Sequence, residues 1–444
     1  MNIVQITPGA GGMYCGGCFR DNALVAALRK AGHETLMVPL YLPLTLDEAD
    51  QSAGTPTFFG GISVYLEQKS SFFRTAPQWM HNLLSSPALL KWASKYSAST
   101  RAADVGDLMI SMLRGEEGNQ ARELDELIAW LKTQPKPDII CLSNALLAGM
   151  ARKLKRELNC TVTCLLGGED AFLDGLPDSV RDTAWKTLSE RCRDVDLFLP
   201  PTRYFSELMA RRLDLNANQL CVVPNGINLA GYGTADSPST HGDSMKPPVL
   251  GYFARMCKEK GLDTLVDAYL LLKKRDATEK LHLHVGGGCG PSDEPFVDEQ
   301  RRKLSDAGVM GDVQFFPNVD HAAKIALLRG LTVFSTPALY GEAFGLYVIE
   351  ALAAGVPIVQ PRHAAFPELV QATGGGLLCE PGIPESLADT IESLLLDPQR
   401  ARALGAAGCE VVARDFSIDT VAVRILDVFK QALAGKSPLE NHLQ

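Results

Sequence analysis

The sequence predicts an α/β protein made of two Rossmann-like domains, each built around a parallel sheet. Short apolar segments with strand character alternate with helical segments through almost all of the 444 residues. This alternation is typical of parallel sheets joined by right-handed crossovers. It runs through two cycles, and a segment rich in Gly, Ser and Pro, Gly231 to Pro248, separates them without apolar periodicity. The composition, 46% hydrophobic and 21% charged, is that of an ordinary globular protein.

The first cycle opens with a strand, a glycine-rich turn and a helix over Arg20 to Ala31 whose apolar residues recur at helical spacing. The strands predicted in this cycle are Ile3 to Thr7, Glu34 to Leu40, Asp138 to Leu142, Cys160 to Leu166, Asp196 to Leu199 and Leu220 to Val223. Those of the second cycle are Val249 to Ala254, Leu281 to Val285, Val313 to Phe316, Leu331 to Thr336, Pro357 to Val359 and Gly376 to Cys379.

These segments predict domains at residues 1–225 and 226–416, followed by a C-terminal helix, 417–444, that would pack back on the first domain. Residues 51–118 interrupt the first domain with an aromatic-rich insertion that reads as mostly helical. Ordinary packing of extra helices is the favoured interpretation of its aromatic side chains. Binding of an acceptor, or contact with a membrane surface, is the alternative.

Composition also narrows the class of function. The formal net charge of −9 argues against a nucleic acid partner. No apolar run approaches the ~20 residues of a membrane span, and the first residues lack the pattern of a signal peptide. We therefore expect a cytoplasmic protein, with peripheral contact at the inner membrane face left open. Its eleven cysteines read as reduced thiols. Cys15 and Cys18 lack the further ligands of a zinc site, so no metal is expected.

The most informative segment is GEAFGLYVIE, residues 341–350, which follows a predicted strand and leads into a predicted helix. Glu342 and Glu350 lie eight positions apart, a little over two helical turns. A strand that feeds a loop and then a helix leaves backbone N–H groups and a positive dipole end in the loop. This arrangement suits the phosphates of a nucleotide, with one carboxylate near the ribose and the other near the group carried by the diphosphate.

Two other strand ends carry groups that suit phosphate. Arg255 and Lys260 flank the short loop after the first strand of the second domain, where two cations can hold a diphosphate and stabilise it as it departs. The first strand of the chain ends in a glycine-rich turn, in which Gly11 and Gly12 are the candidates to face a phosphate. The turn is not a G-x-G-x-x-G fingerprint, which disfavours NAD.

These motifs carry a resemblance to family 4 of the retaining glycosyltransferases, which have the GT-B fold. The matching pieces are R-x4-K-G at Arg255, E-x7-E at Glu342, the ALAAGVPIV that follows it, PNGIN at the domain junction, and the N-terminal glycine turn with RKAGHE. Together they cover nearly the whole chain outside the insertion.

The resemblance implies roles for individual residues. Glu342 would lie by the donor sugar and Glu350 by the ribose, while Arg255 and Lys260 would bind the diphosphate. The amide of Gly12 would approach phosphate as well. Backbone N–H groups would hold sugar and phosphate at Ala343, Phe344, Gly345 and Leu346.

The chain departs from the family pattern on the acceptor side. Many members carry His-Gly where this sequence has Gly167 and Gly168, and Glu169 or Asp170 could substitute or could equally cap the next helix. Weaker candidates are Asn225, which is first of all part of an Asn-Gly turn, and Val319, whose loop could meet a nucleobase through its backbone.

The sequence thus predicts a metal-independent retaining glycosyltransferase that moves a sugar from a nucleoside diphosphate donor to the hydroxyl of a glycan or lipid acceptor. No cofactor is expected, and the resemblance makes UDP the commonest donor nucleotide. A nucleotide-sugar 2-epimerase and a non-catalytic nucleotide-sugar-binding protein remain alternatives. Neither the donor sugar, the acceptor nor the oligomeric state can be read from these residues.

Overall fold

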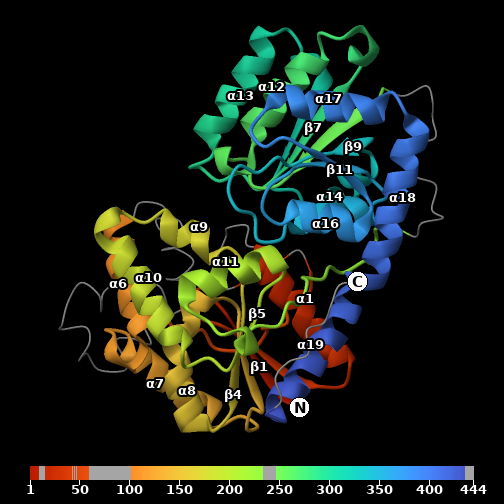
Figure 1. Cartoon of the computed structure of the whole chain (residues 1–444). Coiled ribbons are helices and arrows are strands. Elements are labelled where there is room, and N and C mark those ends of the chain that lie inside the picture. Colours follow the sequence, from red (N-terminus) through yellow and green to blue (C-terminus); the bar gives the residue numbers. More distant parts are fainter. Residues whose placement is uncertain are drawn as a thin grey trace. The chain divides into compact units, whose positions relative to one another are not determined.

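The computed structural model describes residues 1–9, 16–42, 44, 46, 48–59, 102–233 and 247–435 (Figure 1). The chain divides into two compact units. One comprises Met1–Pro224 and the C-terminal helix from Val421, and the other comprises Asn225–Thr420. Gly11, Gly12, Cys15 and residues 60–101 of the predicted insertion lie outside the described residues.

Among its described residues, the first unit is built on a parallel sheet of five strands in the order β2-β1-β3-β4-β5. Its strands are β1 (Asn2–Thr7), β2 (Glu34–Pro39), β3 (Ile139–Leu142), β4 (Thr161–Leu165) and β5 (Leu197–Leu199). Its helices are α1 (Gly16–Lys30), α6 (Ala102–Arg114), α7 (Ala121–Leu131), α8 (Ala151–Leu158), α9 (Glu169–Asp174), α10 (Asp178–Cys192), α11 (Arg203–Leu213) and α19 (Ile418–Leu433). In Figure 1, α1 and α19 lie on one side of the strands, and α8 and α10 lie on the other.

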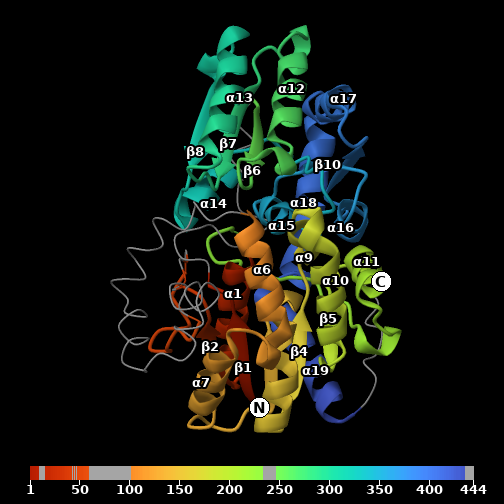
Figure 2. The same cartoon turned by 90° about the vertical axis from the view of Figure 1, so that its left-hand side faces the viewer.

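The second unit is built on a parallel sheet of six strands in the order β11-β10-β9-β6-β7-β8. Its strands are β6 (Val249–Phe253), β7 (His282–Gly287), β8 (Val313–Pro317), β9 (Val333–Phe334), β10 (Ile358–Pro361) and β11 (Gly376–Cys379). Its helices are α12 (Leu262–Leu272), α13 (Glu294–Asp306), α14 (His321–Arg329), α15 (Leu346–Ala353), α16 (Phe366–Thr373), α17 (Pro384–Leu395) and α18 (Pro398–Asp415). Helices α12, α13 and α17 lie above its strands and α14 and α16 lie below them (Figures 1 and 2).

Both sheets confirm the predicted fold class, and the differences from the predicted elements are local. The predicted strand Leu220 to Val223 runs beside β5 but does not form a regular strand: an isolated parallel bridge pairs Leu220 with Phe198, and Cys221 N donates to Phe198 O at 3.0 Å. Pro200 and Pro201 follow β5 directly, and Pro224 closes the segment. Val223 N still donates to Pro200 O at 3.0 Å, but Pro200 has no N–H to return a bond, so no regular ladder forms there. In the second sheet, β9 keeps only two of the six residues predicted.

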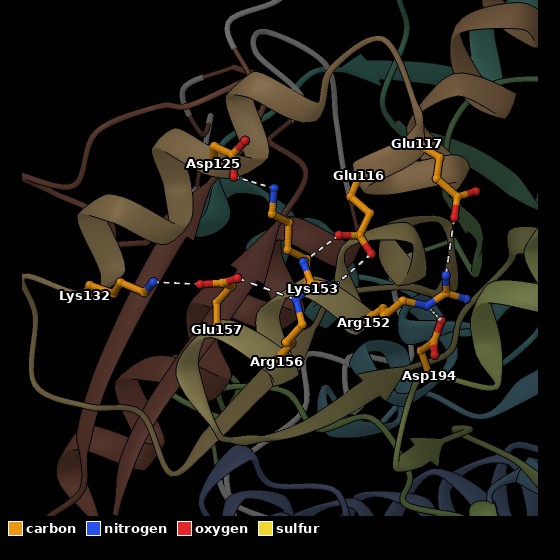
Figure 3. A network of polar contacts seen from close by, with 9 residues as sticks. All are labelled: Glu116, Glu117, Asp125, Lys132, Arg152, Lys153, Arg156, Glu157 and Asp194. Carbon is orange, nitrogen blue, oxygen red and sulfur yellow. Dashed lines mark hydrogen bonds and ion pairs between the residues drawn. The ribbon is translucent and has the colours of Figure 1, made fainter.

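A network of ion pairs covers the surface of the first unit around α8, α7 and the 3-10 turn Gly115–Glu117 (Figure 3). Four basic residues of α8 each face at least one carboxylate of a neighbouring element. The cations are Arg152, Lys153, Lys155 and Arg156. These pairs hold α8 to its neighbours and leave it without a surplus of positive charge.

The helices of the described ranges are too short or too polar to cross a bilayer. Of the described residues of the predicted insertion, 51–59 form turns and irregular structure, and Ala102–Arg114 form a helix.

Candidate functional site

The predicted donor residues lie in the second unit, at the carboxyl ends of strands that are neighbours in its sheet. Strands β9, β6 and β7 are adjacent in the strand order. Arg255 and Lys260 follow β6, and Glu342 follows β9. Because all strands are parallel, the loops that follow them leave from the same edge, which is where ligands bind in sheets of this kind.

Gly261 holds the loop after β6 against the loop after β9. Its φ is +71°, and a Cβ at this position would lie 1.9 Å from the carbonyl oxygen of Pro337. The two loops are also joined by a hydrogen bond, in which Leu339 N donates to Glu259 O at 3.0 Å. Only a residue without a side chain permits this approach, and the approach carries Lys260 to the residues around Glu342.

Lys260 and Glu342 form the centre of a compact cluster. Lys260 Nζ lies 2.5 Å from Glu342 Oε2 and also donates to the hydroxyl of Tyr340. Tyr340 and Tyr347 donate their hydroxyls to the same Oε2, at 2.9 and 2.7 Å. The ammonium lies 4.7 Å from the centre of the Tyr340 ring and 5.2 Å from that of Tyr347, a cation–π arrangement. One carboxylate oxygen therefore receives three donors.

The surroundings of Glu342 favour its ionised form. The residue is only 9% exposed, and burial by itself would raise its pKa. The charge of Lys260 and the hydrogen bonds from Lys260, Tyr347 and Tyr340 together outweigh burial and lower the pKa below its ordinary value of 4.5. Glu342 is thus held as a carboxylate at neutral pH.

Arg255 is paired with Asp293, which lies in the loop after β7. Its Nη2 is 2.8 Å and its Nε 3.1 Å from Asp293 Oδ1. Gly287 brings the two strand ends together, because its φ is +126° and a Cβ would lie 1.9 Å from the carbonyl oxygen of Ala254. The hydrogen bond to Asp293 raises the pKa of Arg255. The guanidinium side chain remains 57% exposed, so it stays accessible to an anion.

Glu350 lies inside α15, as the sequence predicted, and pairs with Lys324 of α14. Lys324 Nζ lies 3.0 Å from Glu350 Oε1, and both side chains are largely buried, with exposed fractions of 7% and 12%. Asp320 caps α14 by accepting a hydrogen bond from Ala323 N at 2.8 Å, which fixes the first turn that carries Lys324.

The backbone predicted to hold sugar and phosphate leads into α15. Ala343 and Phe344 are buried. Gly345 is the N-cap of the helix with a φ of +88°, and Leu346 is its first residue. N–H groups of a first helical turn have no acceptor within the helix, so this end of α15 suits an anion.

The weaker candidates lie outside the cluster around Glu342. Glu169 and Asp170 begin α9 in the first unit, and Glu169 binds the backbone by accepting from Ala145 N and Gly167 N, both at 2.9 Å. Burial raises the pKa of both carboxyls. Asn225 lies at the start of the second unit. Val319 is half-buried in its loop.

Sequence reasoning missed the partners of the predicted residues. It treated Arg255 and Lys260 as two available cations, whereas each has a carboxylate partner, Asp293 or Glu342. It did not single out Lys324. The two tyrosines were visible beside Glu342 in the sequence, but only the folded loop shows that both hydroxyls meet its carboxylate.

Comparison with known proteins identifies this part of the chain. Residues 235–411 match the model of the family described as glycosyl transferases group 1. The chain carries a glycosyl transferases group 1 domain. All the predicted donor residues from Arg255 to Glu350 fall inside that domain.

The curated relatives match the chain in part. A GDP-mannose-dependent alpha-(1-6)-phosphatidylinositol monomannoside mannosyltransferase of Mycobacterium tuberculosis is 32% identical over 189 residues, 41% of this chain and 47% of the relative. A phosphatidyl-myo-inositol mannosyltransferase of Mycobacterium leprae is 29% identical over 236 residues, 52% of this chain and 59% of the relative. The chain thus spans about half the length of these curated relatives.

Solved structures show the same fold over nearly the whole chain. Sucrose-phosphate synthase from Thermosynechococcus elongatus matches with a TM-score of 0.70 at 19% identity, covering 98% of this chain and 100% of that one. HepE of Anabaena, solved in complex with UDP, matches with a TM-score of 0.67 at 16% identity, covering 97% and 100%. The chain has the fold of these GT-B glycosyltransferases.

Proposed function

We propose that the protein is a retaining glycosyltransferase that transfers a sugar from a nucleoside diphosphate to an acceptor hydroxyl without a metal ion. The observation that carries this proposal is the ionised Glu342, held by three donors beside the N-terminus of α15. A fixed carboxylate can accept hydrogen bonds from a sugar, while the helix end and Arg255 can bind the diphosphate that carries it.

The proposed reaction proceeds on one face of the sugar. The bond between the anomeric carbon and the diphosphate oxygen breaks, and a bond from the acceptor oxygen forms on the same face. The acceptor proton passes to an oxygen of the departing diphosphate. Arg255 and Lys260 stabilise the negative charge that grows on that diphosphate, and the configuration of the sugar is retained.

The donor nucleotide is the first point to test. The relative from Mycobacterium tuberculosis is named as GDP-mannose-dependent, whereas HepE was solved with UDP. Thermal shift with UDP, GDP and their hexose conjugates separates these donors, because a ligand that binds only the folded state raises the melting temperature. A protein stabilised by none of them would contradict the proposal.

Turnover of the donor found in this way tests the chemistry. With acceptor, NMR of the product should show the anomeric configuration of the donor, and a chelator in excess should leave the rate unchanged. Loss of activity that Mn²⁺ or Mg²⁺ restores would contradict metal independence. With donor alone, a change of configuration at carbon 2 of the sugar would instead identify an epimerase.

For the acceptor, we propose a glycan or lipid hydroxyl. Both relatives cited above carry phosphatidylinositol, or a mannoside of it, in their names. Incubation with donor and with vesicles that contain phosphatidylinositol tests the lipid directly: labelled sugar should appear in the lipid fraction. Sedimentation with the same vesicles would measure the peripheral membrane contact that a lipid acceptor requires.

A further inference from the structure

We infer that Tyr340 and Tyr347 are positioning residues that turn Glu342 so that a single carboxylate oxygen, Oε1, faces a sugar hydroxyl. This inference rests on the proposed function, because it names the chemistry that Glu342 would perform on the donor. The two tyrosines would orient Glu342 without contacting the phosphate or the sugar themselves.

The geometry distinguishes the two oxygens of this carboxylate. Oε2 accepts from Lys260 at 2.5 Å, from Tyr340 at 2.9 Å and from Tyr347 at 2.7 Å. Oε1 accepts no hydrogen bond from the part of the chain that the structure describes, and it is not one of the fully buried oxygens that lack a partner. Oε1 is therefore the oxygen that remains available to a ligand.

The free oxygen selects a hydrogen-bond donor. An ionised carboxylate only accepts hydrogen bonds and repels phosphate at close range. Sugar hydroxyls are donors that carry no charge, so they fit Oε1. Lys260 donates to Glu342 Oε2 and to the hydroxyl of Tyr340, which leaves one of its three N–H donors for the diphosphate.

The two tyrosines hold Glu342 from different elements. Tyr347 lies in the first turn of α15, is 8% exposed, and packs its ring 6.3 Å from that of Phe334. Tyr340 lies in the half-buried loop before Glu342. The two phenols and Lys260 are the titratable groups whose charge or hydrogen bonds lower the pKa of Glu342. Removing one hydroxyl leaves the carboxylate less fixed and easier to protonate.

Substitution to phenylalanine tests the inference without removing the rings. Binding of a nucleoside diphosphate and of its sugar conjugate is measured by calorimetry, with UDP and UDP-glucose and with GDP and GDP-mannose. In Tyr347→Phe the affinity for the conjugate should fall about tenfold, the effect of losing one hydrogen bond to a charged group. The affinity for the sugarless nucleotide should stay unchanged.

Tyr269→Phe is the matched control. Its hydroxyl is buried and donates to Leu281 O at 3.0 Å, so its loss changes stability but no group near Glu342. The control should keep the affinity for the sugar conjugate. If the control and Tyr347→Phe lose it equally, the tyrosines have only a packing role and the inference fails.

Titration of the Glu342 carboxyl gives a second readout that needs no ligand. With ¹³C-labelled glutamate, its signal is the one that Glu342→Gln removes. In Tyr347→Phe and in Tyr340→Phe the midpoint should rise toward the ordinary value, because a donor to the charged form is lost. An unchanged midpoint in both variants would overturn the inference. If the unaltered protein binds no nucleotide sugar, the proposed function fails, and the titration still decides the role of the tyrosines.

Discussion

The ion pairs on the surface of the first unit and the cluster around Glu342 in the second unit both include a lysine paired with a glutamate. They differ in how far water reaches the charged groups. In the surface network (Figure 3), Lys132 and Glu157 lie 2.8 Å apart and remain 50% and 35% exposed. In the cluster, Lys260 and Glu342 lie 2.5 Å apart and are only 19% and 11% exposed. The distances between the charges are similar in the two pairs, so the pairs differ mainly in their exposure to solvent.

Water and salt screen an exposed pair, and its partners exchange easily with solvent. The hydrogen bond from Lys132 lowers the pKa of Glu157, yet water reaches both of these side chains. Around Glu342, burial removes water, so each donor must come from the protein and only one oxygen is left open. A short distance between charges therefore identifies a candidate site only together with burial and an unsatisfied acceptor.

Of the substitutions that test this contrast, Lys260→Met should destabilise the protein most. It leaves a carboxylate buried without its counter-charge, which costs about 3–5 kcal/mol of the free energy of unfolding. Urea denaturation at neutral pH measures the loss, and binding of the nucleotide sugar should fall with it.

The pH dependence of that loss has a definite sign. In the unaltered protein the pKa of Glu342 is below 4.5, so the stabilisation is complete above that value and is lost as pH falls through the lowered pKa. In Lys260→Met, burial without the cation raises the pKa, so the carboxyl becomes neutral sooner on acidification. The difference between the two proteins should therefore begin to narrow above pH 4.5, as the carboxyl of the variant takes up its proton, and should narrow further as pH falls through the lowered pKa of the unaltered protein. A constant difference would show that the charge of Lys260 is not what stabilises the cluster.

Gly261→Ala should have the next largest effect, because it separates the two loops that form the cluster. The new Cβ would collide with the carbonyl oxygen of Pro337 in a backbone conformation of positive φ. The expected loss is about 3 kcal/mol, measured by thermal and urea unfolding, with weaker binding of the nucleotide sugar. Gly308→Ala is the control, since its φ is +73° and no atom lies within 4 Å. It should cost only about 1 kcal/mol for the strained backbone. Equal losses would remove the argument that Gly261 brings the loops together.

Lys132→Ala should have the smallest effect. The pair with Glu157 is exposed, so the midpoint of urea unfolding should stay within experimental error, at low salt and at high salt alike. A clear loss of stability would mean that the network of Figure 3 acts as a unit and that the contrast with the buried cluster is weaker than described.

Periodicity in the sequence was sufficient to predict both parallel sheets, because alternating strands and helices have few other ways to pack. It was insufficient at Leu220–Val223, where the residues have strand propensity but the neighbouring prolines restrict pairing. For the site, the spacing of Glu342 and Glu350 placed one in a loop and the other in a helix. The spacing could not predict the partners of the two carboxylates, because Lys260 and Lys324 lie on other elements far away in the chain.

Local patterns along the chain were enough to predict the α/β class and the strand ends that carry charged groups. These follow from local periodicity and from the conformations that single residues permit. The folded loops were needed to show that Lys260, Tyr340 and Tyr347 share one oxygen of Glu342 and leave the other open. This arrangement depends on burial and on contacts between loops, which no spacing along a chain encodes.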